Sequence, residues 1–307
     1  MSDAETTLLA RALAIAGENP EAVVAVVGAT GSGKTELAIG LADKLGGEII
    51  GCDSVQIYQH FDIGSGKPSA DDLARATHHM VGVLDPHDAV DAARYGAMAR
   101  AAIADVVLRG RRPIVCGGTF LWVKSLLYGL AEAPPADDAI RARHRAMAES
   151  EGRPAVHARL REVDAESATR LHPNDLVRVS RALEVYELTG KAMSAWQSEH
   201  GFATAHHPSR MIAIAHEPDV LTARIEARVR AFLDAGWIDE VKSLRARGYG
   251  DARAIGSVGY REVSAFLDGK VEEDKLVTAI VRATRIFARR QRTWLNHADV
   301  AWLRANA

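Results

Sequence analysis

A glycine-rich segment near the amino terminus reads Gly-Ala-Thr-Gly-Ser-Gly-Lys-Thr over residues 28–35. An apolar, β-branched run at residues 22–27 precedes it, and a helical pattern of apolar residues follows it. Strand, glycine loop and helix in this order are the context in which such a segment binds polyphosphate. The glycines let successive backbone N–H groups converge on phosphate oxygens, and the helix amino terminus adds a favourable partial charge. We therefore predict a phosphate loop at residues 28–35.

All eight residues of the phosphate loop are candidate ligands of a pyrophosphate or nucleotide: Gly28, Ala29, Thr30, Gly31, Ser32, Gly33, Lys34 and Thr35. Lys34 is expected to contact the phosphates, and the Thr35 hydroxyl is expected to bind Mg²⁺. The alternative is a glycine turn without a ligand, which motif and context together disfavour. The motif indicates a polyphosphate but names neither the nucleotide nor the chemistry.

Other short apolar runs predict further strands, at residues 48–52, 80–84, 113–116, 211–215 and 300–303. Helical patterns separate most of them, notably at residues 92–108 and 120–128. Apolar strands that alternate with amphipathic helices indicate a parallel sheet covered on both faces. The predicted fold class is therefore α/β, with a P-loop NTPase-like parallel sheet flanked by helices.

The alternation of strands and helices stops at Ala133-Pro134-Pro135. No strand pattern follows until about residue 207, and the intervening helical stretches are rich in Arg, Glu and Ala. We interpret residues 133–207 as an all-helical insertion domain that leaves the α/β core and returns to it. Residues 1–132 and 208–307 then form the catalytic α/β core, which includes a long helix from about residue 274 to 294.

Asp53 ends the second predicted strand, beside the strand that carries the phosphate loop. Ligands of open α/β sheets bind at the carboxyl ends of the strands, so this carboxylate faces the expected site. It could accept a proton or hydrogen bond from an incoming nucleophile, or it could be the metal-associated acid of an ordinary P-loop ATPase. A third interpretation is that it only caps the following turn. The strand at 113–116 runs into Gly117-Gly118-Thr119 rather than into an acid, which weakens the motor-ATPase interpretation but still allows a small-molecule kinase.

Composition sets outer limits on the function. Apolar residues make up 48% and charged residues 25% of the 307, and the net charge is −2, so any nucleic acid must bind a local basic patch. Cys52 and Cys116 lie in apolar runs and are expected to be buried, reduced thiols. Neither a signal peptide nor a membrane span is recognisable, so we expect a cytoplasmic protein that does not bind membranes.

Several segments, taken in order, resemble the tRNA dimethylallyltransferases, also called isopentenyl-tRNA transferases. Beyond the phosphate loop they are Asp53-Ser54-Val55-Gln56-Ile57-Tyr58, Asp62-Ile63-Gly64-Ser65-Gly66-Lys67-Pro68, Leu84-Asp85-Pro86, Gly117-Gly118-Thr119, His172-Pro173-Asn174-Asp175, Val258-Gly259-Tyr260-Arg261-Glu262 and Arg290-Gln291-Arg292-Thr293-Trp294. The resemblance covers nearly the whole chain. Small departures occur at Ser65-Gly66, Trp122 and Ser257, where the family commonly has Thr-Ala, Tyr and Cys.

The resemblance implies transfer of a dimethylallyl group from dimethylallyl pyrophosphate to the exocyclic amine of the adenine 3′ of the anticodon. The phosphate loop would hold the pyrophosphate with Mg²⁺, Asp53 would receive the hydrogen bond or proton of the amine, and Arg228 would neutralise the departing pyrophosphate. Thr119 is the third candidate catalytic residue. The implied tRNA contacts are Asp53, Ser54, Val55, Gln56, Thr119, Arg141, Arg178, Arg181, Gly259, Tyr260, Arg261, Arg289 and Arg292. The anticodon stem-loop is the expected partner, and the protein is expected to be a monomer.

Two arginine-rich regions are candidate RNA surfaces. In the insertion, acidic residues accompany the arginines, so composition alone favours a solvated, salt-bridged face. In the last long helix, Arg285, Arg289 and Arg292 lie on one stripe without a neighbouring acid, which favours RNA contact. We expect Trp196 and Trp237 in packing roles. The histidines expected at the surface are His144, His157, His206 and His207.

Three functions remain open on the residues alone: the prenyl transfer that the resemblance implies, a P-loop kinase that acts on a small metabolite, and an RNA-binding module with a relic phosphate loop.

Overall fold

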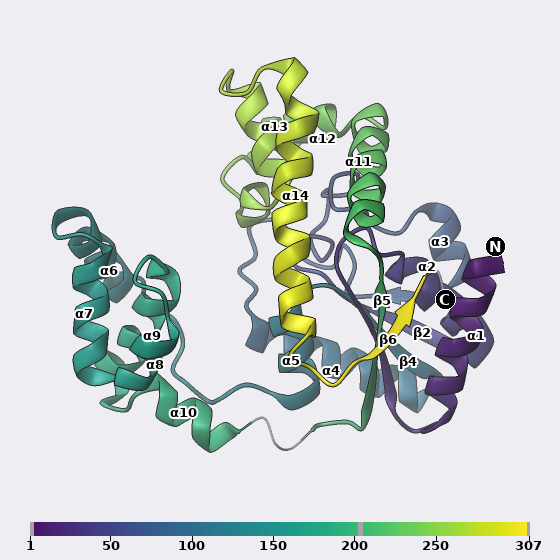
Figure 1. Cartoon of the computed structure of the whole chain (residues 1–307), viewed down its shortest axis with the longest axis horizontal. Coiled ribbons are helices and arrows are strands. Elements are labelled where there is room, and N and C mark those ends of the chain that lie inside the picture. Colours follow the sequence, from purple (N-terminus) through teal and green to yellow (C-terminus); the bar gives the residue numbers. More distant parts are fainter. Residues whose placement is uncertain (1–2, 202–204, 306–307) are drawn as a thin grey trace. The chain divides into compact units, whose positions relative to one another are not determined.

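The computed structural model describes residues 3–201 and 205–305, which divide into two compact units (Figure 1). The first unit comprises residues 1–127 and 205–307, and the second comprises residues 128–204. The sequence predicts the two junctions slightly further along the chain, between residues 132 and 133 and between residues 207 and 208. Each unit is described by itself.

The first unit contains a six-stranded parallel sheet with the strand order β3-β2-β4-β1-β5-β6 (Figure 1). The strands are β1 (Val23–Val27), β2 (Gly47–Cys52), β3 (His78–His79), β4 (Arg112–Gly117), β5 (Ser209–Ala215) and β6 (Ala301–Arg304). The register aligns Val24 of β1 with Ile114 of β4 and with Arg210 of β5. This parallel α/β sheet is the fold class that the sequence predicts.

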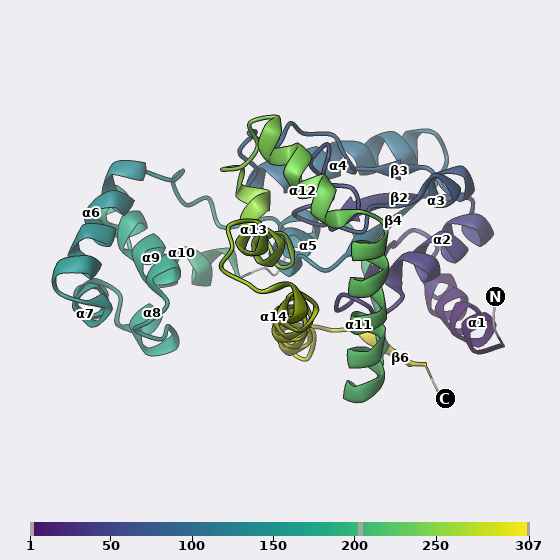
Figure 2. The same ribbon diagram turned by 90° about the horizontal axis from the view of Figure 1, so that it is seen from above.

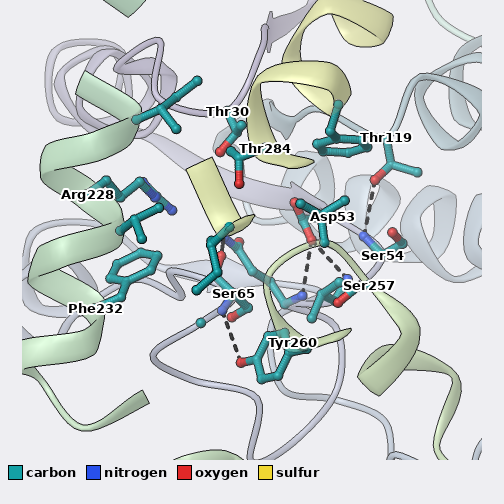
Figure 3. A pocket seen from close by; sticks show the side chains of 18 of the residues that line it. Thr30, Asp53, Ser54, Ser65, Thr119, Arg228, Phe232, Ser257, Tyr260 and Thr284 are labelled. Carbon is teal, nitrogen blue, oxygen red and sulfur yellow. Dashed lines mark hydrogen bonds between the residues drawn. The ribbon is translucent and has the colours of Figure 1, made fainter. Parts of the chain in front are cut away.

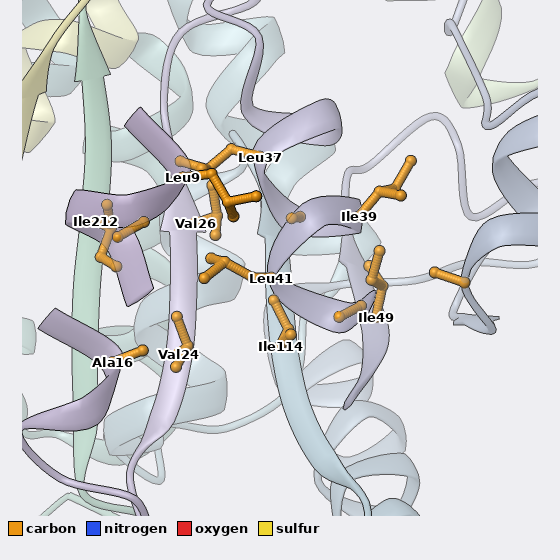
Figure 4. Packing of buried hydrophobic residues seen from close by; sticks show 14 of the residues in the cluster. Leu9, Ala16, Val24, Val26, Leu37, Ile39, Leu41, Ile49, Ile114 and Ile212 are labelled. Atoms are coloured by element: carbon orange, nitrogen blue, oxygen red, sulfur yellow. The ribbon is translucent and has the colours of Figure 1, made fainter. Parts of the chain in front are cut away.

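Helices cover both faces of the sheet, as the turned view shows (Figure 2). Helices α1 (Asp3–Gly17) and α2 (Lys34–Leu45) pack on one face, and α4 (Ala92–Leu108) packs on the other. Alternate strand residues such as Val24, Val26 and Ile114 form one apolar core with side chains of α1 and α2 (Figure 4). Burial of these β-branched side chains, each worth about 1.5–3 kcal/mol, holds the layers together. The other helices of the first unit before residue 128 are α3 (Ala70–Arg75) and α5 (Phe120–Tyr128).

The strand predicted at residues 80–84 is wrong. The third strand is only His78–His79, and beyond it Met80 and Gly82 both adopt φ values of +63°. A left-handed backbone turns the chain out of the extended conformation, so the ladder cannot continue. Only a single bridge, between Tyr58 and Leu84, forms in that stretch.

After β5 the chain forms a cluster of helices. They are α11 (Pro218–Asp234), α12 (Trp237–Ala246), the short 3₁₀ helix η1 (Arg253–Gly256), α13 (Tyr260–Leu267) and α14 (Glu273–Leu295). Helix α11 packs on α14, and α13 packs on both α12 and α14. Helix α14, drawn in yellow, is the long helix that the sequence predicts at 274–294 (Figure 1).

The second unit contains helices and no strand among its described residues. The helices are α6 (Asp138–Ser150), α7 (Arg153–Val163), α8 (Ala165–Arg170), α9 (Leu176–Thr189) and α10 (Met193–His200). Val156, Leu160 and Val179 centre their own apolar core. The expected surface positions of His144 and His157 are wrong, because both are buried at 2% and 5% exposure. His144 Nδ1 lies 2.9 Å from the Ser180 hydroxyl, and His157 Nε2 lies 3.0 Å from the Ala168 carbonyl.

Candidate active site

The phosphate loop lies between β1 and α2, at the carboxyl edge of the sheet. Gly31 and Gly33 adopt φ values of +81° and +88°, a conformation that only glycine takes without strain. A side chain at Gly28 would place its Cβ 2.8 Å from the Ser32 hydroxyl. The glycines at these positions are therefore required by the shape of the loop.

Two side chains form hydrogen bonds with carbonyl groups of the phosphate loop. Arg224 Nε donates to the Gly31 carbonyl at 2.8 Å, and His216 Nε2 lies 2.8 Å from the Ser32 carbonyl. Since a trans peptide directs its C=O and N–H to opposite sides, the N–H of Gly33 points away from His216. The first N–H groups of α2 have no partner within the helix. The loop thus presents N–H donors on the side that faces a cavity.

That cavity, here called the front cavity, has a volume of about 350 Å³. Its lining includes Lys34 and Thr35 of the loop, Asp53 after β2, Thr119 after β4 and Arg228 of α11. Figure 3 shows Arg228 and Phe232 on one side of the cavity and Asp53, Ser54 and Thr119 on the other. All three predicted catalytic residues thus line one cavity with the phosphate loop.

Two cations that line the front cavity, Lys34 and Arg228, have no ion pair among the described residues. Burial lowers the pKa of Lys34, and among the smaller influences Arg228 lowers that pKa and Asp53 raises it. Burial also lowers the pKa of Arg228, while Asp53 raises it. Within residues 3–201 and 205–305 the Arg228 guanidinium has no ion pair. It lies 4.7 Å from the centre of the Phe232 ring and also packs against Gly66, where a Cβ would come within 1.9 Å of it. A desolvated, unpaired cation beside a phosphate loop is a ready binding site for an anion.

Apolar side chains form the wall of the cavity next to these cations. Ile225, Val229 and Phe232 of α11 and Trp237 of α12 all line it. The Phe232 and Trp237 rings meet edge to face at 5.8 Å. This wall can accommodate a hydrocarbon group of a ligand whose phosphates lie near the cations.

Asp53 occupies the opposite, polar side. Its Oδ1 accepts hydrogen bonds from the backbone N–H groups of Val55 at 2.9 Å and Gln56 at 3.2 Å. The turn-capping role that the sequence left open is therefore real, and it uses Oδ1. These contacts orient the carboxylate toward the front cavity, which Ser54, Val55 and Gln56 also line. Thr119 Oγ1 accepts from the N–H of Ser54 at 3.2 Å and so ties the two strand ends together.

Tyr260, predicted to contact tRNA, is only 1% exposed and is not available as a stacking surface. Its hydroxyl donates to Glu240 at 2.6 Å and accepts from the N–H of Ser65 at 3.1 Å. Burial raises the pKa of this phenol, and the neighbouring Glu240 raises it further. Tyr260 therefore fixes the loop at residues 62–66 against α12, and it is also one of the residues that line the front cavity.

The residues on either side of Tyr260 also have structural contacts. Gly259 has φ +91°, and a Cβ there would lie 2.3 Å from the Trp237 ring. Arg261 pairs with Glu262 at 2.6 Å on the surface. Gln56, another predicted tRNA contact, donates its amide to the carbonyls of Ser65 at 3.0 Å and Gly66 at 2.9 Å.

Gln291 of α14 is a functional candidate for which the sequence predicts no role, although it belongs to the motif at residues 290–294. The side chain is 6% exposed and lines the front cavity. Its Oε1 accepts from the Thr30 N–H at 2.9 Å, and its Nε2 donates to the Gly118 carbonyl at 2.9 Å. One amide thus joins the phosphate loop to the loop after β4. The only signal in the sequence is a polar residue on the buried stripe of an amphipathic helix.

The predicted RNA contacts in the second unit differ from one another. Glu184, which is fully buried, receives hydrogen bonds from Arg141 at 2.9 Å and Arg181 at 2.6 Å. Burial raises the pKa of Glu184, but the hydrogen bonds from Arg141, Arg181 and the Asp137 N–H, with the charge of Arg181, together outweigh it and the pKa is lowered. Arg178 is exposed and has only a long contact, 3.5 Å, to Asp175. Arg141 and Arg181 therefore stabilise the unit, and Arg178 is the one left available to RNA.

The arginines of α14 are organised differently. Arg282, Arg285, Arg289 and Arg292 line a cavity of about 420 Å³ between α11 and α14, here called the arginine groove. No acidic residue lines it, and within the described part of the chain none of the four makes an ion pair. Unpaired arginines that share a groove form the local basic patch that RNA binding requires.

The donors for Mg²⁺ fit that ion. The Thr35 hydroxyl and the Asp53 carboxylate both line the front cavity, and both supply the hard oxygen atoms that Mg²⁺ prefers. Among the described residues no group of three or more His, Cys, Asp or Glu side chains forms a metal cluster. This donor set suits an ion that is held largely by the phosphates of a substrate.

No helix among the described residues combines the length and apolar character needed to cross a membrane. Cys52 and Cys116 are both free, Cys52 fully buried and Cys116 partly so.

Comparison with known proteins gives consistent matches along the chain. A family model described as IPP transferase matches residues 56–298. The chain is 59% identical over 289 residues to a tRNA dimethylallyltransferase of Sorangium cellulosum, covering 94% of this chain and 92% of that protein. Among solved structures, the tRNA isopentenylpyrophosphate transferase of Bacillus halodurans has 34% identity and a TM-score of 0.69, with 93% and 90% of the two chains covered. A eukaryotic dimethylallyltransferase acting on tRNA has 27% identity and a TM-score of 0.76, with 93% and 74% covered.

Proposed function

The chain belongs to the IPP transferase family and is a tRNA-prenylating enzyme, and from that premise we propose how the front cavity performs the transfer. In this proposal dimethylallyl pyrophosphate is the donor, and the acceptor is the exocyclic amine of the adenine immediately 3′ of the anticodon. The P-loop kinase alternative is set aside, because the relatives are prenyltransferases.

One observation supports the choice of donor above the others. The desolvated cations Lys34 and Arg228 and the apolar wall at Phe232 and Trp237 lie in the same cavity. Dimethylallyl pyrophosphate has the matching pair of parts, a diphosphate joined directly to a short hydrocarbon. A nucleoside triphosphate would place a polar ribose against that wall, at the cost of burying unsatisfied hydroxyl groups.

The diphosphate is bound by the backbone N–H groups of the phosphate loop, by Lys34 and by Arg228. Bound Mg²⁺, held by Thr35 with Asp53 nearby, would neutralise part of the diphosphate charge and make it a better leaving group. As the C–O bond to the allylic carbon breaks, negative charge grows on the diphosphate. Cations and N–H donors that are already in place stabilise this charge without reorganising, and each is typically worth about 10²–10³ in rate.

The prenyl group lies against Phe232 and Trp237. Positive charge that develops on its allylic carbon is stabilised by the negative faces of these rings. The apolar wall also limits the water that could intercept the carbon.

The acceptor adenine enters the polar side of the cavity after it is turned out of the RNA stack, at a cost of a few kcal/mol. Asp53 accepts the proton of the amine as the new N–C bond forms and the C–O bond breaks. The hydrogen bonds to Oδ1 hold the carboxylate in place. Thr119 and Ser54 are linked by their own hydrogen bond and line the cavity beside Asp53, where they position the nucleotide.

The arginine groove and the exposed Arg178 supply the backbone contacts to the anticodon stem-loop. We include in the proposal that one chain suffices as a monomer, since every residue assigned to the reaction lies in one unit of one chain. Its place of action would be the cytoplasm, where its substrate tRNA is used.

Mass spectrometry of tRNA incubated with the protein, Mg²⁺ and dimethylallyl pyrophosphate tests the proposal. The expected result is one added C₅H₈ unit per tRNA, located by nuclease digestion at the adenosine 3′ of the anticodon. Modification at another nucleotide would overturn the assignment of the acceptor, and an unmodified tRNA would overturn that of the donor.

A further inference from the structure

A second cavity, here called the rear cavity, lies behind the phosphate loop and has a volume of about 320 Å³. Ala29 and Ser32 of the loop line it, together with the ends of β5, α14 and β6. None of the residues assigned to the transfer reaction lines the rear cavity apart from the loop itself and Arg292. It therefore calls for a separate explanation.

One residue that lines this cavity, Ser32, has a buried hydroxyl without a hydrogen-bond partner among the described residues. Ser32 is 3% exposed, and its Oγ makes no hydrogen bond within the described residues. An unsatisfied buried polar group typically costs about 1–3 kcal/mol, so its presence calls for an explanation, and a bound ligand is one. A ligand oxygen in the rear cavity would satisfy it.

The charge of the rear cavity has one sign. Its lining contains Arg292, Arg304 and His216, and no acidic residue. Neither arginine makes an ion pair within residues 3–201 and 205–305, whereas Arg141 and Arg181 in the second unit both pair with Glu184. Two unpaired guanidinium groups and an unsatisfied hydroxyl are the donor set of a phosphate site.

The rest of the lining fits a nucleotide. Trp302 of β6 offers a ring on which a base can stack, and Ile214 and Leu295 add apolar surface. The rear cavity also adjoins the arginine groove, because Leu221 and Arg292 line both.

We propose that the rear cavity is a second phosphate site, separate from the site of transfer, that binds a nucleotide through its phosphate group. The nucleotide comes either from the bound RNA, reached along the arginine groove, or from a free nucleotide in solution. The first source rests on the proposed function, and phosphate binding in the rear cavity does not. Because His216 lies 2.8 Å from the Ser32 carbonyl, a ligand here also contacts the residues that hold the phosphate loop in shape.

Isothermal titration with uridine 5′-monophosphate tests this site. The probe has no exocyclic amine to prenylate, and saturating dimethylallyl pyrophosphate occupies the front cavity during the titration. We expect Arg304→Gln to weaken binding of the probe about tenfold or more, since the variant cannot make the charge-assisted hydrogen bond. Arg111→Gln is the matched control. Arg111 is exposed and precedes β4, at the amino ends of the strands, away from the phosphate loop. This variant should bind the probe as the wild type does.

A second arm identifies the source. Binding of an anticodon stem-loop RNA is measured for the same variants. If the nucleotide belongs to the RNA, Arg304→Gln weakens RNA binding, lowers its salt slope by roughly 0.7–0.9, and the probe competes with RNA. If it is free, RNA affinity is unchanged in Arg304→Gln and the probe binds alongside RNA.

The proposal is overturned if Arg304→Gln binds both the probe and the RNA as the wild type does. The dissociation constant of dimethylallyl pyrophosphate, measured for each variant in a separate titration without the probe, reports whether the variant is folded. If the wild type fails to bind that donor, the proposed function fails, but the comparison of Arg304→Gln with Arg111→Gln still decides on the rear cavity.

Discussion

The side-chain carbonyl of Gln291 accepts a hydrogen bond from the backbone N–H of Thr30 at 2.9 Å, across 261 residues of sequence. The same amide donates to the Gly118 carbonyl, so helix α14 fixes the phosphate loop relative to the loop that carries Thr119. The two halves of the front cavity, one for the diphosphate and one for the acceptor, are therefore held relative to each other by one residue of α14.

Replacing Gln291 should disturb donor binding before RNA binding. Gln291→Glu keeps the acceptor for Thr30 but loses the donor to Gly118, and Gln291→Ala loses both. Each hydrogen bond is worth about 1 kcal/mol. We therefore expect the KM for dimethylallyl pyrophosphate to rise about fivefold in Gln291→Glu and about twentyfold or more in Gln291→Ala. The dissociation constant of tRNA should stay within twofold or so, because the arginine groove lies on another face of the helix. Thr293→Ala, on the exposed side of the same helix, is the control for both measurements, and an unchanged KM in Gln291→Ala would remove the bracing role.

Local patterns predicted most of the fold. The helices expected at 92–108 and 120–128 match α4 and α5, and the strand expected at 22–27 matches β1 to within one residue. The helices were predicted from their periodicity and the strand from its apolar run before a glycine motif, and both signals extend over a few residues only. The strand expected at 80–84 failed, because left-handed φ angles at Met80 and Gly82 do not show in hydropathy.

Long-range contacts were the part that the sequence could not show. Tyr260 was expected to contact RNA, but its hydroxyl donates to Glu240 and accepts from the Ser65 N–H in the interior. His144 was expected at the surface, and its burial depends on Ser180 and Glu187 from another helix. The role of Gln291 depends on two loops that are far away in the chain. In each case the partner decides the role of the residue.

Asp53→Asn separates the proposed base from the structural cap. The asparagine carbonyl can still accept from Val55 and Gln56, so the turn should survive, but the group can no longer take a proton at neutral pH. We expect turnover to fall about 10²–10⁴-fold with little change in tRNA affinity, and Asp53→Ala to fall at least as far with an added loss of stability. Single-turnover kinetics provide the measurement. Near-normal turnover in Asp53→Asn would reduce Asp53 to its capping role.

Arg228→Gln removes the unpaired cation while keeping much of the packing against Phe232. Because its charge is needed most when diphosphate departs, kcat should fall about 10²–10³-fold, more than donor affinity does. The control is Arg230→Gln, an exposed residue on the same helix that pairs with Glu226. Steady-state kinetics with the donor varied distinguish the two parameters. A rise in KM alone would mean that Arg228 binds the ground state and gives the transition state no extra help.

The two sets of arginines should respond differently to substitution. Arg289→Gln combined with Arg292→Gln should weaken tRNA binding and lower its salt slope by roughly 0.7–0.9 for each phosphate that is no longer neutralised. Arg141→Gln should leave the salt slope unchanged and destabilise the helical unit by about 1–3 kcal/mol, since it leaves buried Glu184 with one partner fewer. Binding isotherms at several salt concentrations, with thermal melts, test both. A lower slope in Arg141→Gln would return that residue to the RNA surface.

Glu48 makes stability depend on pH far from the active site. Hydrogen bonds from Arg109, aided by His79, lower the pKa of Glu48 to about 2, against the effect of burial, which raises it. A carboxyl whose pKa is lower in the folded protein contributes stability above its unfolded pKa of 4.5, and this contribution disappears between about pH 4.5 and pH 2. Glu48→Gln should therefore lower the free energy of unfolding by about 1–3 kcal/mol at pH 7. The lower part of this range applies if solvent screens the partly exposed Arg109. Urea unfolding at pH 7 and pH 3 should show the difference between wild type and variant shrinking at the lower pH, and a constant difference would contradict this assignment.

Release of inorganic diphosphate is the most direct test that the front cavity seats an allylic diphosphate. The protein is mixed with Mg²⁺ and tRNA, and either dimethylallyl pyrophosphate or ATP is added. We predict diphosphate release only with the prenyl donor and only when tRNA is present, and no consumption of ATP. Hydrolysis or transfer from ATP without the prenyl donor would contradict the account.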